Sequence, residues 1–191
     1  MNSECKMNSA VLPTPKLEDD FYDWWERHAA VLRMKNAIDP EIVLIGDSIT
    51  HLWGGEPAAN LRNGAKAFAS VFAPYRVLNL GFGWDRTQNV LWRLDNGEMD
   101  GLHPSAVVLH IGTNNTSETP NAQANTSEEI VEGIAAICSR LRSKAPDATI
   151  ILMKVFPREE TPDHPRRVAI FEINRLLEGF GFRRRDGLNY T

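Results

Sequence analysis

The sequence predicts a single α/β domain in which helices cover both faces of a parallel sheet. Short apolar runs, each followed by glycine and polar residues and then by a helical pattern, occur in the segments 41–53, 75–94 and 106–115. Strands that are apolar throughout are typical of parallel sheets, because both of their faces are buried. The 191 residues can bury one sizeable core but are too few for two ordinary domains.

The first half of the chain is expected to contain a loose arm, a helix and two strands. Residues 1–17 hold Pro13 and Pro15 among small polar residues and predict the arm, which leaves 18–191 as the domain. Apolar residues at helical spacing from Phe21 to Leu32 predict an amphipathic helix. Strands are expected at 42–45 and just after residue 75, separated by a loop and a short helix that ends before Pro74.

The second half is expected to add two strands and two long helices. A strand is expected from residue 106, and 148–155 predicts the fourth. Thr126 and Glu129 have the spacing of a capping box, which opens a helix with one apolar face. A last helix is expected over about 165–177.

Composition excludes several classes of function. No apolar run approaches the ~20 residues needed to cross a bilayer. The formal net charge of -4 gives no footprint for nucleic acid, and the basic run 183–185 is short. Two cysteines are compatible with a reducing compartment, and no secretory signal precedes the domain. We therefore expect a cytoplasmic protein that binds neither nucleic acid nor membrane.

Three glycine-containing segments follow the first three strands: 46–48, 81–85 and 112–115. In open parallel sheets, ligands bind outside the carboxyl ends of the strands, so these segments are expected to meet at one rim. The first of them places Ser48 where a strand ends and a helix begins. A serine hydroxyl needs a base and hydrogen-bond donors for the oxyanion of a tetrahedral intermediate. Donors are available from the helix N-terminus, the glycine turn and the Asn114 side chain.

The same three segments resemble the first three sequence blocks of the SGNH (GDSL-type) hydrolases. The likeness is strongest to the catalytic subunits of brain-type platelet-activating-factor acetylhydrolase and their bacterial relatives. It covers about residues 41–177 and includes 89-NVLWRLDNGE-98 and 153-MKVFPRE-159. The resemblance implies a three-layer α/β/α fold with a parallel, flavodoxin-like sheet.

The resemblance also implies roles for particular residues. Ser48 becomes the nucleophile and first oxyanion donor, and the Asn114 side chain the third donor. The second donor is a backbone N–H in the turn before the aspartate, at Trp84 or Gly83; the family usually has glycine where Trp84 stands. Four further residues are expected to contact substrate: Asp47, Asp85, Asn115 and His164. For Asp47, organisation of the turn is the favoured role.

The fourth block of the family, Asp-x-x-His, supplies the general base from a loop between a fifth strand and a closing helix. Residues 178–191 leave no room for a strand, the loop and a helix, and at 186–189 asparagine replaces the histidine. We therefore expect a sheet that lacks its last strand and helix. The apolar face so exposed predicts a homo-oligomer or poor solubility.

The remaining candidates for the general base are the histidines elsewhere in the sequence. His103 lies in a literal Asp-x-x-His match, but at the amino end of a strand. His51 is one helical turn beyond the serine and poorly aimed, and His110 is expected to be a hydrogen-bonded core residue. His28 is expected to pack or to be exposed. His164, in a loop after the fourth strand, is the one neighbouring candidate that remains.

The leading hypothesis is a serine esterase that cleaves short acyl esters of a lipid or carbohydrate through an acyl-enzyme. The alternative is a catalytically impaired, truncated protein of the same fold that only binds an ester or carbohydrate. A dinucleotide-binding domain is rejected because Arg86 stands where its fingerprint needs a third glycine. No cofactor and no metal site are expected, and the expected partner is a small ester.

Overall fold

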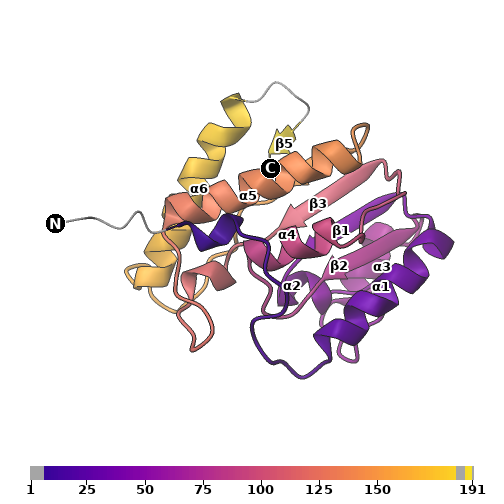
Figure 1. Ribbon diagram of the computed structural model, residues 1–191, viewed down its shortest axis with the longest axis horizontal. Helices are drawn as coiled ribbons and strands as arrows, with labels where there is room; N and C mark the ends of the chain where they lie inside the picture. Colours follow the sequence, from indigo (N-terminus) through magenta and orange to yellow (C-terminus); the bar gives the residue numbers. More distant parts are fainter. Residues whose placement is uncertain (1–6, 184–187, 191) are drawn as a thin grey trace.

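The computed structural model describes residues 7–183 and 188–190, with side chains described up to residue 179 (Figure 1). Its centre is a five-stranded sheet in the order β2-β1-β3-β4-β5, and every pairing is parallel. The strands are β1 (Ile42–Gly46), β2 (Val77–Gly81), β3 (Ala106–His110), β4 (Thr149–Leu152) and β5 (Leu188–Tyr190). This order confirms the predicted flavodoxin-like sheet.

The expectation that the sheet lacks its last strand was wrong. β5 pairs in parallel with β4, with Ile150 opposite Leu188 and Leu152 opposite Tyr190. Residues 178–191 were expected to be too few for a strand, a loop and a helix together, whereas an edge strand of three residues fits there. Residues 186 and 187 of the Asp-Gly-Leu-Asn echo lie outside the described part of the chain.

The helices are divided unequally between the two faces of the sheet. Four long helices pack on one face: α1 (Trp24–Ile38), α4 (Thr87–Asp95), α5 (Ser127–Lys144) and α6 (Pro165–Arg183). On the opposite face lies α3 (Ala65–Phe72), which is behind the sheet in Figure 1. Two short helices, α2 (Ser48–His51) and η2 (Asn114–Thr116), follow the carboxyl ends of β1 and β3.

Burial follows this division. On the four-helix face, Val43, Ile45 and Leu109 are fully buried against α4 and α5. On the other face a small cluster of Leu44, Phe72 and Val77 is buried under α3. Beyond α3, the side chains at 108, 151 and 153 are only half-buried, so this apolar face is partly open.

Residues 7–17 do not form the loose arm that was expected. They contain a short helix, η1 (Ser9–Val11), with Ala10 fully buried against the start of α4. The Thr87 hydroxyl donates to the Ala10 carbonyl over 2.8 Å, and Asn89 Nδ2 donates to the carbonyls of Thr14 and Pro15. Composition indicated a segment without long regular structure, but it could not show that the backbone finds partners on α4.

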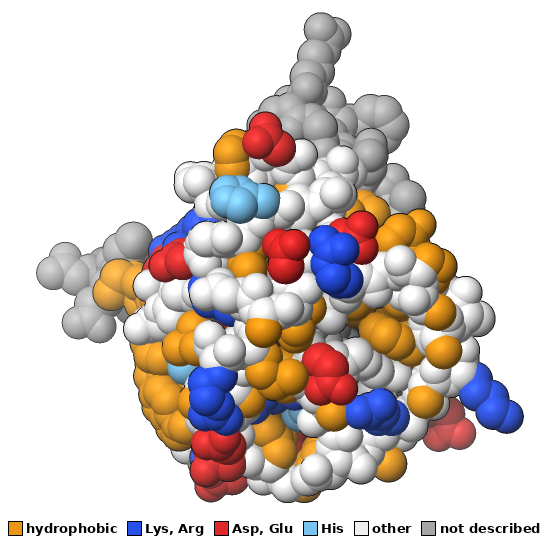
Figure 2. Space-filling model, turned by 90° about the vertical axis from the view of Figure 1, so that its right-hand side faces the viewer, with side chains coloured by type: hydrophobic (Ala, Val, Ile, Leu, Met, Phe, Trp, Pro, Cys, Tyr) orange, Lys and Arg blue, Asp and Glu red, His pale blue; other side chains and the backbone are white. Residues whose placement is uncertain are grey.

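The predicted start of α5 is confirmed. Thr126 Oγ1 accepts from Glu129 N, and the Glu129 carboxylate accepts from Thr126 N, so both halves of the capping box are present. In the part of the chain that the structure describes, no helix is long and apolar enough to cross a membrane. On the face drawn in Figure 2, basic and acidic side chains are interspersed, and neither sign forms a continuous patch.

Candidate active site

Glycines bring α2 close to the strand ends and so place Ser48 at the rim. A Cβ on Gly46 would collide with Thr50 Oγ1, and a Cβ on Gly81 would collide with the backbone N of His51. The side chain of Asp47 caps α2 by accepting from Ile49 N over 3.0 Å. Ser48 is therefore the first residue of α2, half-exposed at the carboxyl end of β1.

The turn after β2 holds the second expected oxyanion donor. The N–H of Gly83 donates to His51 Nδ1 over 3.3 Å, and its carbonyl accepts from the Tyr22 hydroxyl. The expectation that Gly83 could be the donor is therefore corrected, because its N–H is already engaged in holding the turn against α2.

Trp84 is the remaining candidate in this turn. Its φ is 62°, the left-handed region in which glycine is favoured, although its side chain is bulky. Its N–H has no partner in the described structure, and its indole is 40% exposed. A tryptophan thus adopts a backbone shape that favours glycine, and its N–H points to no partner among the described residues.

Asn114 comes from the segment after β3. Gly112, with a φ of 122°, turns the chain so that the next residues form η2. Asn114 Nδ2 donates to the backbone oxygen of Asp85 over 3.0 Å, and the side chain is 7% exposed. An amide nitrogen carries two hydrogens, so one remains for a ligand.

Three hydrogen bonds join the glycine-containing segments into one rim. Phe82 N donates to the Gly46 carbonyl over 3.0 Å, which links the ends of β1 and β2. The bond between Gly83 and His51 ties the turn to α2, and the bond from Asn114 ties it to η2. The predicted convergence of the three segments is present, with Ser48, Trp84 and Asn114 contributed one by each.

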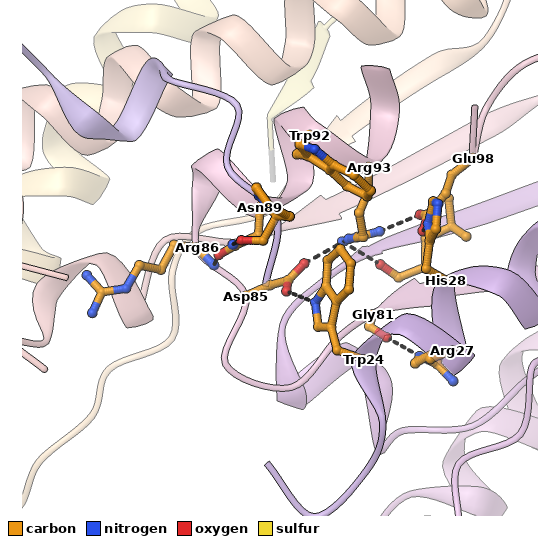
Figure 3. Close-up of polar contacts among 12 residues, drawn as sticks. Trp24, Arg27, His28, Gly81, Asp85, Arg86, Asn89, Trp92, Arg93 and Glu98 are labelled. Carbon is orange, nitrogen blue, oxygen red and sulfur yellow. Dashed lines mark hydrogen bonds and ion pairs between the residues drawn. The ribbon is translucent and has the colours of Figure 1, made fainter. Parts of the chain in front are cut away.

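Asp85 was expected to contact substrate, but its side chain is 2% exposed and points into the core (Figure 3). Oδ1 accepts from the Trp24 indole N–H and Oδ2 from Arg93 Nε, each over 2.8 Å. Burial raises the pKa of this carboxyl to about 6, against the opposing effects of Arg93 and Trp24. Asp85 therefore supports the turn from below.

A network of buried charged side chains continues from Asp85 and was not predicted from the sequence. Arg93 also donates to Glu98 through Nη1 and to the Leu80 carbonyl through Nη2, and Glu98 meets His28 Nδ1 at 2.7 Å (Figure 3). Arg93 and Glu98 are fully buried, and His28 is 8% exposed, so it packs as expected. The signal was present in 89-NVLWRLDNGE-98, where an arginine lies within the apolar run 90–94 and a glutamate follows five residues later.

Asn115 and Asp47 are also unavailable to substrate through their side chains, which corrects two expected contacts. Asn115 is fully buried, accepts from Thr87 N over 3.0 Å and donates to Gln88 Oε1, so it anchors the start of α4. Asp47 is fully buried as the cap of α2, which agrees with its favoured role in organising the turn. Its Oδ2 has no partner among the described residues, and burial raises its pKa to about 7.

His164 caps the beginning of α6. Its Nδ1 accepts from Arg166 N over 3.3 Å, and its backbone N–H donates to the Thr161 carbonyl. The side chain of this loop that does approach the rim is Arg158, which the sequence analysis did not single out. Its charge opposes the rise in the pKa of Asp47 that burial causes, and its Nη1 lies 3.4 Å from Ser117 Oγ.

The other histidines are engaged elsewhere or distant. His51 is buried, and burial together with Arg27 and Arg93 lowers its pKa to about 3. His110 is buried beside Phe156 with no hydrogen-bond partner in the described structure, so the expectation of a hydrogen-bonded core histidine was wrong. His103 is exposed near the amino end of β3, as expected. In the described part of the chain, no histidine ring is hydrogen-bonded to Ser48.

No group of three or more His, Cys, Asp or Glu side chains within the described ranges is arranged to hold a metal ion.

Comparison with known proteins gives matches along most of the chain. The GDSL-like lipase/acylhydrolase family profile matches residues 44–186. A Drosophila melanogaster homologue of platelet-activating factor acetylhydrolase IB subunit beta is 34% identical over 174 residues, which span 91% of this chain and 70% of the relative. Human platelet-activating factor acetylhydrolase IB subunit alpha1 is 33% identical over 172 residues, 89% of this chain and 67% of the relative.

Solved structures share the fold at lower identity. An acetylxylan esterase from Geobacillus stearothermophilus superposes with a TM-score of 0.61 over 79% of this chain and 74% of that chain, at 18% identity. An α/β hydrolase from the metagenome of Lake Arreo, Spain, gives a TM-score of 0.60 over 79% and 75% of the two chains, at 21% identity. These likenesses show a shared α/β architecture.

Proposed function

This chain belongs to the GDSL-like lipase/acylhydrolase family, and we propose that it is a serine ester hydrolase that cleaves short acyl esters of a lipid or carbohydrate through an acyl-enzyme. The supporting observation is the rim at which Ser48 lies with two free hydrogen-bond donors, Trp84 N–H and Asn114 Nδ2. Relatives named acetylhydrolases and a structural neighbour named an acetylxylan esterase support the choice of a small acyl group.

The proposed reaction uses the rim in two stages. Ser48 Oγ attacks the ester carbonyl carbon and passes its proton to a base, which is either an imidazole or solvent hydroxide, and the carbonyl oxygen becomes an oxyanion. Ser48 N–H, Trp84 N–H and Asn114 Nδ2 donate to this oxyanion, which is stabilised more than the neutral carbonyl was. Collapse expels the alcohol, which takes its proton from the protonated base or from water. Water then attacks the acyl-serine by the same route and releases the carboxylic acid.

Arg158 and Trp84 give this rim its specificity in the proposal. The Arg158 guanidinium borders the rim, with Nη1 3.4 Å from Ser117 Oγ and Nε paired with Glu159, so in the proposal it favours substrates with a polar alcohol group on that side. The exposed Trp84 indole forms an apolar wall beside its own N–H, which favours a compact acyl group there.

A second candidate function is binding of an ester or carbohydrate with little turnover. It is favoured by one observation: the histidines of the described part of the chain make no hydrogen bond to Ser48. Loss of a triad member reduces turnover by ~10⁴ to 10⁶, while oxyanion stabilisation and binding leave about 10³-fold over water. The two candidates therefore differ by orders of magnitude in rate rather than in the site used.

Hydrolysis of p-nitrophenyl acetate by the purified protein, by Ser48→Ala and by His164→Ala tests the proposal. A rate far above that of Ser48→Ala establishes the serine hydrolase. Its pH profile then identifies the base, because an imidazole base gives a rate that levels off above about pH 7, whereas hydroxide gives a rate that keeps rising. Loss of the plateau in His164→Ala would assign the base to the loop before α6.

Equal rates for the protein and Ser48→Ala would reject the hydrolase. In that case, tryptophan fluorescence would follow the binding of a non-hydrolysable ester analogue. Binding that is abolished in Asn114→Ala would support the binding function. Absence of both hydrolysis and binding would reject both candidates.

A further inference from the structure

An apolar cavity lies on the open face of the sheet, beside the turn that carries Ser48. Its volume is about 210 Å³, and its walls are almost entirely apolar. The residues that form it most directly are Leu44, Ile49, Trp53, Val108, His110 and Phe156. An engineered apolar cavity of about 150 Å³ binds benzene, so this volume suffices for a six-membered ring or a short chain.

The cavity exists because α3 covers only part of this face. Leu44 at the floor of the cavity is 2% exposed, and Val108 on the neighbouring strand is half-buried. Phe156 at the mouth of the cavity is 45% exposed. Ile49, the residue after Ser48, is 43% exposed at the edge nearest the candidate active site. The site is therefore a concave hollow with an open mouth, which is the usual form of a small-molecule site.

His110 distinguishes this hollow from a simple defect in packing. Its side chain is 4% exposed and lines the cavity, and neither ring nitrogen has a hydrogen-bond partner among the described residues. Burial lowers its pKa to about 4, so the ring is neutral near pH 7 and presents one donor and one acceptor. Unsatisfied buried polar groups are uncommon in proteins because each is costly, and a ligand that pairs with His110 would remove that cost.

We propose that this cavity is a binding site for a small aromatic or aliphatic molecule that carries one hydroxyl or amide group, which pairs with His110. The apolar walls hold the hydrocarbon part, and Phe156, whose ring centroid is 4.3 Å from that of His110, closes the site at the same end as the polar group. The site is separate from the rim of Trp84 and Asn114, so it does not depend on hydrolytic activity.

Benzene and phenol are suitable probes because they match in size and differ by one hydroxyl. Titration of the ¹⁵N-labelled protein with each, followed by amide chemical shifts, should move the signals of the cavity residues. Phenol should bind tighter than benzene by about fivefold, the factor expected for one hydrogen bond. In His110→Phe, which keeps a ring but removes both nitrogens, this advantage should disappear while benzene still binds.

A second variant tests the location. Val108→Phe places a larger side chain on the floor of the cavity, directly beside Leu44, and should abolish binding of both probes. Val71→Phe, the same change at an exposed position of α3 outside the cavity, should leave binding unchanged. Dispersed amide spectra for each variant establish that it is folded before its titration is interpreted.

Three outcomes would overturn the proposal. The first is that neither probe moves the cavity signals up to its solubility limit. The second is that phenol and benzene bind equally to the unmodified protein. The third is that the cavity signals shift or broaden with protein concentration alone while light scattering reports a dimer, because a second copy then covers the cavity.

Discussion

Arg93 Nε and Asp85 Oδ2 are 2.8 Å apart, and both side chains are almost wholly buried beneath the turn that carries Trp84. The pair fixes the position of Asp85, whose backbone oxygen in turn accepts from Asn114 Nδ2. The geometry of the candidate oxyanion donors thus depends on an ion pair that no substrate touches.

Replacing Arg93 is expected to destabilise the protein severely. Arg93→Leu leaves Asp85 and Glu98 buried without their cation, and breaking a buried pair in this way costs about 3–5 kcal/mol. Arg140→Leu is the matched control, because Arg140 pairs with Asp95 at the same 2.8 Å but at the surface, where a pair contributes about 1 kcal/mol or less. Urea unfolding measures both, and equal losses would contradict the buried-network argument.

The backbone at Trp84 provides a second prediction. Left-handed geometry costs a residue with a Cβ about 1–2 kcal/mol, so Trp84→Gly should be more stable than Trp84→Ala by roughly 1 kcal/mol. Both variants remove the indole, and the difference therefore isolates the backbone. Thermal unfolding of the pair is sufficient, and a Trp84→Ala that equals or exceeds Trp84→Gly in stability would argue against strain at this position.

Adjacent asparagines should behave differently. Asn114→Ala removes a proposed oxyanion donor and should lower kcat by about 10²–10³, with a modest change in KM. Asn115→Ala breaks buried bonds to the start of α4 and should lower stability by about 1–3 kcal/mol, with a smaller effect on kcat in the folded fraction. Steady-state kinetics and urea unfolding of both variants separate these effects. A normal kcat in Asn114→Ala would exclude its proposed role.

Asp47 should make the protein less stable as pH rises. Its folded pKa of about 7 lies above its ordinary value of 3.8, so the folded state holds the proton more tightly than the unfolded state. Its contribution to stability is therefore full below about pH 4 and is lost as pH rises through 7. Asp47→Asn mimics the protonated form. Its free energy of unfolding, relative to that of the unmodified protein, should increase by a few kcal/mol between about pH 5 and pH 8. A constant difference between the two would contradict the assignment.

Two buried histidines should have the opposite dependence. Burial lowers the pKa of His51 to about 3 and that of His110 to about 4, from an ordinary 6.5. The unfolded state then binds protons more readily, so the contribution of each is full above about pH 6.5 and is lost as pH falls toward the folded values. Two variants, His51→Gln and His110→Phe, should each lose about 2 kcal/mol less stability than the unmodified protein between about pH 7 and pH 5. Glutamine at position 51 keeps an acceptor for the Gly83 N–H. An unchanged loss would mean that these rings are not the responsible groups.

The parts of the fold and site that could be predicted are those written in local sequence. Apolar strands with a glycine at or just after their ends indicate β1, β2 and β3, and the polar residue types that follow indicate Ser48 and Asn114 as candidate site residues. The anomalous Trp84 was also visible, because a glycine was expected there.

What was missed depends on partners distant in the chain. Nothing local shows that Ala10 packs on α4, that three residues suffice for β5, or that Asp85 faces Arg93 rather than solvent. Gly83 and Trp84 are adjacent in sequence, and only the bond from Gly83 to His51 tells which N–H is free.

The contact between Trp24 and Asp85 joins residues 61 positions apart, and Asn114 reaches the same turn from 29 positions further along the chain. We expect contacts between segments so distant to form late in folding, because closing the long intervening loops costs conformational entropy before the contacts stabilise the chain. The donors at the rim therefore acquire their arrangement only when α1, α4 and the central strands have all assembled. A partly folded chain would therefore carry Ser48 without the two candidate donors, Trp84 N–H and Asn114 Nδ2, arranged beside it.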